Sequence, residues 1–160
     1  MSVTATKDTA AQVVRSIEAM AGKHVVIGIP AAKAPRKGDP ISNAALGYVH
    51  EHGSPAQNIP PRPFLVPGVK AAAPDVMRVL RNAAVKSIGA TARREELVRG
   101  LHAAGLLAQA SIKQTLKDLP EHPDDSAVIR ARRRAGFKGS KALIRTGQLL
   151  NSVTYEVRDR

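Results

Sequence analysis

The sequence contains no cysteine and very few aromatic residues. Among its 160 residues, two are phenylalanine, two are tyrosine and none is tryptophan. Without cysteine there are no disulfides, no thiolate nucleophiles and no cysteine-based zinc or iron–sulfur sites. The core must come mainly from alanine, valine, leucine and isoleucine, and a chain of this kind often completes its burial against copies of itself. We therefore expect an oligomer stabilised by packing alone.

The chain also lacks a long hydrophobic run. Nowhere do about 20 consecutive apolar residues occur, which is the length that a membrane span needs. The first twenty residues carry Lys7, Asp8, Arg15 and Glu18, where a signal peptide would have an apolar core. We expect a protein made in the cytosol without a membrane partner, and the length suits one domain.

Acidic residues are outnumbered by basic ones. With 25 Lys and Arg against 13 Asp and Glu, the net charge is +12. Such a charge attracts DNA or an acidic protein surface, although it can also serve solubility alone. The densest positive charge, here called the basic arm, comprises Arg130, Arg132, Arg133, Arg134, Lys138 and Lys141.

The basic arm is the candidate contact for a partner. It has no aromatic residues positioned to stack on bases, and no helix-turn-helix accompanies it, so sequence-specific recognition is not expected. An assembly contact with an acidic neighbour is the favoured interpretation, and contact with DNA phosphates is the second.

Motifs of catalysis or metal binding are missing. His50 and His52 are two residues apart, so on a helix they point to nearly opposite sides, whereas zinc-protease histidines are four apart. No Gly-x-Ser-x-Gly sequence is present, and residues 136–141 lack the spacing of a phosphate-binding loop. We expect no catalytic residue, no cofactor and no metal. A hydrolase or metal enzyme would require a bound ion or a convergent polar pocket.

The first half of the chain alternates regular segments with irregular ones. Apolar spacing predicts an N-terminal helix over 4–21. A buried strand is expected at 24–30, followed by a flexible basic loop at about 31–40. Ser42 is placed to cap a helix that ends near Gly53. The proline-rich residues 54–63 then predict a stiff, extended path.

Two long helices are predicted next. The first covers 67–88, with Pro74 either in its first turn or at a kink. The second ends before Pro120 and carries a continuous apolar stripe. This stripe comprises Leu97, Leu101, Ala104, Ala108, Ile112, Leu116 and Leu119.

The C-terminal part begins with a second flexible basic loop, at about 120–142. One helical turn capped by Thr146 and a half-buried strand over 153–158 follow. That strand can pair with the first one, over 25–29. The predicted fold is a single α+β domain with a small antiparallel or mixed sheet, two long helices, an N-terminal helix and extended loops.

Two segments resemble a known family. Residues 41–55 (ISNAALGYVHEHGSP) lead into 58–65 (NIPPRPFL), and residues 143–155 read LIRTGQLLNSVTY. These resemble the virion-morphogenesis and tail-completion proteins of tailed bacteriophages. In that family a helix leads into an "I-P-x-R-P-F-L" segment, and a "T-G-x-L-x-x-S-[IV]-x-Y" element lies near the end. The position of His52 is often aromatic in those proteins, and the basic arm has no fixed counterpart among them.

The resemblance implies a structural, non-enzymatic virion subunit. The resemblance implies that the subunit forms a ring at the tail end or the head–tail neck, with sixfold symmetry expected to match a tail, and that it completes or joins the tail. Its partners would be copies of itself, neighbouring neck and tail proteins and packaged DNA, and it would assemble in the host cytoplasm. The alternative is a non-specific DNA-binding protein that uses the basic arm. The candidate interface residues are Tyr48, His50, Ile59, Arg62, Phe64 and Leu65.

Phe64 has two interpretations. Three prolines, Pro60, Pro61 and Pro63, restrict the backbone before it and fix its position, so it can anchor a neighbouring subunit. The same restriction also allows Phe64 to fill the core of its own chain. The sequence leaves both open.

Overall fold

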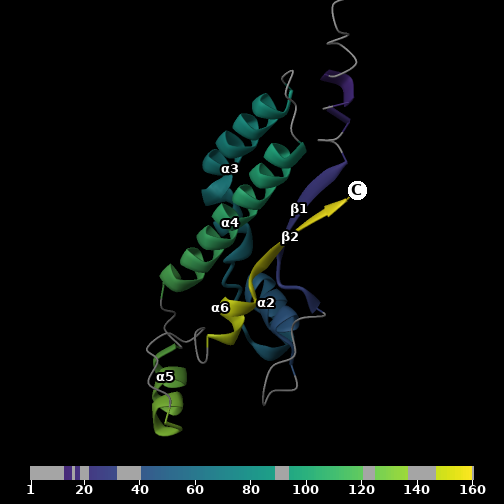
Figure 1. Cartoon of the computed structure of the whole chain (residues 1–160). Helices are drawn as coiled ribbons and strands as arrows, with labels where there is room; N and C mark the ends of the chain where they lie inside the picture. Colours follow the sequence, from purple (N-terminus) through teal and green to yellow (C-terminus); the bar gives the residue numbers. More distant parts are fainter. Residues whose placement is uncertain are drawn as a thin grey trace, which may run out of the picture. The chain divides into compact units, whose positions relative to one another are not determined.

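The structure is a computed structural model that describes residues 13–15, 17–18, 22–31, 41–88, 94–120, 125–136 and 147–159 (Figure 1). The elements in chain order are β1 (Lys23–Gly28), α2 (Asn43–His52), the short 3-10 helix η2 (Pro55–Gln57), α3 (Leu65–Ser87), α4 (Arg94–Asp118), α5 (Asp125–Arg134), α6 (Gln148–Ser152) and β2 (Thr154–Asp159).

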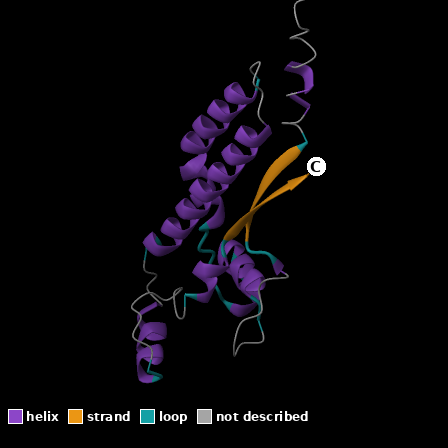
Figure 2. Cartoon of the chain, in the orientation of Figure 1, coloured by secondary structure: helices purple, strands orange, loops and turns teal. Residues whose placement is uncertain are grey.

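The α+β class is confirmed. Helices dominate the described part of the chain, and β1 pairs with β2 in a two-stranded antiparallel sheet (Figure 2). The two long helices and the pairing of the first strand with the last are present as predicted.

The contacts divide the chain into two compact units. The first contains residues 1–26, 73–107 and 155–160, and the second contains 27–72 and 108–154. Both strands, α3 and α4 contribute residues to both units. The single domain stays a prediction.

The second unit has a core of large, buried aliphatic side chains around one phenylalanine. Phe64 precedes α3, Ile112 and Leu116 come from α4, Leu149 comes from α6, and Val153 precedes β2. Phe64, Ile112 and Val153 have no exposed surface. Around this core lie six partly buried residues: Ile27, Ile29, Leu46, Leu65, Leu119 and Leu150.

The predicted stripe of α4 is confirmed, because six of its seven residues are buried and the seventh, Leu119, packs against the core from just beyond the helix.

The first unit uses glycines of α4 for close packing. A Cβ added to Gly100 would lie 2.2 Å from the Cβ of Ala83 on α3, and one added to Gly105 would lie 2.3 Å from the Tyr155 ring. Both distances are too short for real atoms, so glycine at these positions lets the neighbouring elements approach.

The contact between Gly100 and Ala83 gives a testable prediction. The Gly100→Ala substitution should lower the free energy of unfolding by about 1–3 kcal/mol because the new methyl group overpacks the helix contact. The Ala83→Gly substitution alone should cost about 1 kcal/mol through helix propensity. Combining them moves the methyl group from one helix to the other, so the double variant should recover most of the stability in urea unfolding. Simple addition of the two losses would contradict this packing.

Several local expectations are wrong. β1 is half-buried, not buried, because its residues alternate, and Val26 is 38% exposed. Of the two positions expected for Pro74, only the first turn is excluded, because α3 begins at Leu65 and Pro74 lies inside the helix. The N-cap of α6 is Gly147, with a φ of 72°, and not Thr146. Glycine adopts this φ readily, and threonine does not.

A helix also replaces part of the loop expected over 120–142. Residues Asp125–Arg134 form α5. Its composition explains the result, because alanine and arginine favour helices. In addition, Asp125 and the final arginines have the signs that stabilise the N- and C-terminal ends of a helix dipole.

Other predicted segments fall only partly within the described residues. In the N-terminal helix predicted over 4–21, residues 13–15 and 17–18 are helical, and the others predicted there lie outside the described residues. Nearly all of the loop at 31–40 and the whole of 137–146 lie outside them as well.

Candidate functional site

The family-like segment 41–65 begins with a well-capped helix. As predicted, the Ser42 hydroxyl accepts a hydrogen bond from the backbone N–H of Ala45, at 3.1 Å. α2 ends at His52, and the N–H of the C-cap residue Gly53 donates to the carbonyl of Val49 at 2.7 Å. Gly53 has a φ of 77°, and an added Cβ would lie 2.9 Å from the backbone N of Pro61. The chain can therefore reverse here only with glycine.

The proline-rich residues after Gly53 form a closed loop and not a continuously extended path. Ser54 and Ile59 exchange backbone hydrogen bonds of 2.8 and 3.0 Å, and η2 lies between them. Asn58 has a φ of 54°, which asparagine tolerates better than most residues. The loop is held by its own backbone, and its tip at 55–58 is exposed.

Glu51 connects the end of α2 to the start of α3. Its carboxylate accepts hydrogen bonds from the backbone N–H groups of Phe64 (2.7 Å), Leu65 (2.8 Å) and Val66 (3.0 Å). The glutamate is only 8% exposed. The first N–H groups of a helix have no partner within it, and the positive end of the helix dipole lies there. Glu51 supplies both the missing acceptors and the opposite charge.

The prolines complete this arrangement. Pro60, Pro61, Pro63 and Pro67 have no N–H to satisfy. The N–H of Arg62 donates to the carbonyl of His50 at 2.6 Å, and that of Gly68 donates to the carbonyl of Phe64 at 3.1 Å. With the three bonds to Glu51, every backbone N–H from residue 60 to residue 68 has a partner. This explains why a glutamate and a proline-rich "PPRPFL" sequence occur together.

Glu51 was not among the residues predicted for the site. A carboxylate in the last turn of a helix is unfavourable for that helix, because the C-terminal end of the dipole is also negative. This mismatch was the signal available in the sequence. It indicates that the charge serves another element.

The predicted interface residues lie in the second unit but differ in accessibility. Tyr48 is 66% exposed, and its ring centroid lies 4.6 Å from that of His52. Phe64 is fully buried in its own core, so the structure shows the internal one of its two interpretations. The remaining candidates are partly buried: His50, Ile59, Arg62 and Leu65.

The described part of the basic arm lies on α5. Arg130, Arg133 and Arg134 are exposed there. Arg132 belongs to the same helix, but its side chain is outside the described residues, as are Lys138 and Lys141.

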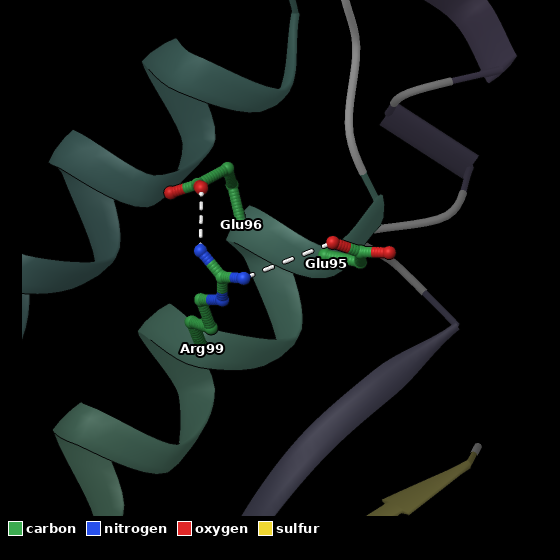
Figure 3. A network of polar contacts seen from close by, with 3 residues as sticks. All are labelled: Glu95, Glu96 and Arg99. Atoms are coloured by element: carbon green, nitrogen blue, oxygen red, sulfur yellow. Dashed lines mark hydrogen bonds and ion pairs between the residues drawn. The ribbon is translucent and has the colours of Figure 1, made fainter.

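Several acidic side chains already have basic partners elsewhere in the chain. Arg99 binds Glu96 at 3.1 Å and Glu95 at 3.8 Å in the first turns of α4 (Figure 3). Lys23 binds Asp159, and this hydrogen bond with its charge attraction lowers the pKa of the aspartate. These exposed pairs contribute little to stability.

Within the described ranges, no group of three or more histidine, aspartate or glutamate side chains is arranged to hold a metal ion. The helices described there include none that is long and apolar enough to cross a membrane. Comparison of the chain with protein-family models, curated proteins and solved structures gives no match.

Proposed function

We propose that this protein is a structural subunit of a tailed-phage virion that assembles with copies of itself into a ring at the tail end or neck. The ring completes or joins the tail, and the subunit acts by shape complementarity and not by catalysis. The proposal rests on the resemblance of residues 41–65 and 143–155 to tail-completion proteins.

The observation that carries the proposal is an exposed aromatic pair beside a rigid segment. Tyr48 is 66% exposed in a chain with two tyrosines and two phenylalanines. It contacts His52 on α2, the helix whose Glu51 holds the start of α3. A rigid exposed tyrosine loses little entropy on binding, and tyrosine is enriched among the residues that dominate interface energies.

Exposed aliphatic residues also support assembly. They occur in both units, and burying such side chains against another copy of the chain would be favourable. The most exposed are Val14, Ile17, Val66, Met77, Val85 and Leu106. If each copy presents two different surfaces to its neighbours, association closes into a ring when the rotation between copies fits.

The test is the mass of the purified protein by light scattering across a concentration series. Because the net charge of +12 opposes self-association, the series is repeated at several salt concentrations. We expect a defined oligomer, and Tyr48→Ala should weaken association at least about tenfold, the effect of losing roughly 1.4 kcal/mol at an interface. Gln114→Ala, at an exposed polar position on α4, is the control and should leave the mass unchanged.

A monomer at every concentration and salt would argue against the proposal. Equal weakening by Tyr48→Ala and Gln114→Ala would remove the aromatic pair as its supporting observation.

A further inference from the structure

α5 places three arginines on one face. Arg130, Arg133 and Arg134 are separated by three and four positions, and residues so spaced are neighbours on a helix with Cβ atoms about 5–6 Å apart. All three are exposed. The helix fixes their spacing, whereas in a flexible loop the same residues would have no common orientation.

These three charges are not neutralised within the described part of the chain. No ion pair or hydrogen bond there involves their guanidinium groups, whereas Arg78, Arg99 and Arg158 all bind carboxylates. α5 itself contributes one acidic residue, Asp125, at the opposite end from the final arginines. The arginine face therefore has a strong positive field.

Helix stability does not account for all three residues. Cations in the last turn stabilise a helix by about 0.3–1 kcal/mol each, which explains Arg133 and Arg134. Arg130 precedes the last turn and lies outside the range of this effect. Its position beside the other two is explained better by a ligand.

The exposed surface of α5 favours nucleic acid over an acidic protein. Protein interfaces have an apolar centre with anchoring side chains, whereas DNA interfaces are polar, hydrated and positively charged. Beside the arginines, the described side chains of α5 are those of Ser126 and Ala131, which are exposed, and Ile129, which is partly buried. None of the exposed ones among them offers a large apolar anchor. The arginine side chains match phosphate oxygens in geometry as well as charge.

We propose that the arginine face of α5, formed by Arg130, Arg133 and Arg134, binds the phosphate backbone of duplex DNA without regard to sequence. The proposal does not depend on ring assembly. It assigns a partner to α5 and predicts a salt-dependent affinity, because each phosphate contact releases counterions.

The test measures binding of the full-length protein to a short fluorescent duplex by anisotropy, from about 50 to 200 mM salt. The variant Arg130→Gln/Arg133→Gln/Arg134→Gln removes three charges and keeps good helix propensity. The control variant, Lys70→Gln/Arg81→Gln/Lys86→Gln, removes the same charge from exposed positions on α3. Circular dichroism confirms that both variants fold.

We expect the α5 variant to reduce the slope of log affinity against log salt by about 2–3, close to 0.9 per lost phosphate contact. The control variant should change the slope by less than about 0.9, the value for one phosphate contact. Duplexes of different sequence should bind with the same affinity.

Three outcomes would overturn the proposal: no duplex binding at the lowest salt, equal loss in both variants, or an unchanged slope in the α5 variant. Equally tight, α5-dependent binding to polyglutamate would assign the face to an acidic protein. The mass measurement without DNA tests the ring separately, so either result can fail alone.

Discussion

Replacing Phe64 with alanine is expected to lower the free energy of unfolding by about 3–5 kcal/mol, the usual cost of deleting a fully buried aromatic ring. Phe64 has no exposed surface and lies in one cluster with Ile112, Leu116, Leu149 and Val153. These residues come from segments far apart in the sequence. The cavity would therefore loosen contacts among several elements, and urea unfolding followed by circular dichroism measures the loss.

Two variants separate this internal role from an interface role. Phe64→Leu keeps an apolar side chain and should cost less than about 2 kcal/mol. Tyr48→Ala removes an exposed ring and should change monomer stability by less than about 0.5 kcal/mol. If Phe64→Ala instead abolished assembly while leaving unfolding unchanged, Phe64 would be an anchor between subunits.

Replacing Glu51 with alanine is expected to cost about 2–4 kcal/mol, because it removes a charged acceptor from three N–H groups at the start of α3. Glu51→Gln has nearly the same shape but carries one oxygen and an NH₂ group, which cannot accept from these donors. Glu51→Gln should therefore lower the free energy of unfolding by more than half as much as Glu51→Ala does. Urea unfolding gives the free energy, and hydrogen exchange at Phe64, Leu65 and Val66 should accelerate.

Glu95→Gln is the matched control. Glu95 also lies near the start of a long helix, and its ion pair with Arg99 is exposed. Its loss should cost less than about 0.5 kcal/mol. If Glu51→Gln and Glu95→Gln lowered the free energy of unfolding by similar amounts, the loss in Glu51→Gln would come from removing a negative charge near a helix N-terminus. The three hydrogen bonds to Glu51 would then not be its cause.

These two predictions assign different roles to neighbouring residues of one motif. Glu51 fixes the start of α3 and Phe64 fills the core, while Tyr48 on the same helix as Glu51 is exposed. The internal residues give the segment its rigidity. Under the proposed function, the exposed residues then contact another subunit at little entropic cost.

Local patterns predicted the regular elements well where one physical signal was strong. The stripe from Leu97 to Leu116 predicted the buried face of α4, because helical periodicity alone sets which residues share a face. Ser42 and Gly53 predicted the ends of α2, because capping requires those residue types. Thr146 was the wrong cap, because α6 begins at Gln148 and the residue before it is Gly147, whose positive φ suits glycine.

Composition was misleading where two signals competed. Charge and the nearby prolines suggested a loop over 120–142, but alanine, arginine and the distribution of charge along Asp125–Arg134 favour the helix α5. The interface role of the exposed candidates and the identity of the partner stay predictions, since both depend on surfaces outside this chain.

By itself, the sequence determined the fold class, the two long helices, the pairing of the terminal strands and the absence of cysteine chemistry. These follow from local periodicity, capping and composition. Only the tertiary structure decided that Glu51 holds the first N–H groups of α3, that Phe64 faces inward, and that Gly100 admits Ala83. Each of these three contacts joins residues that are distant in the sequence. Their hydrogen-bond partners and steric limits therefore depend on how the chain folds and not on local sequence patterns.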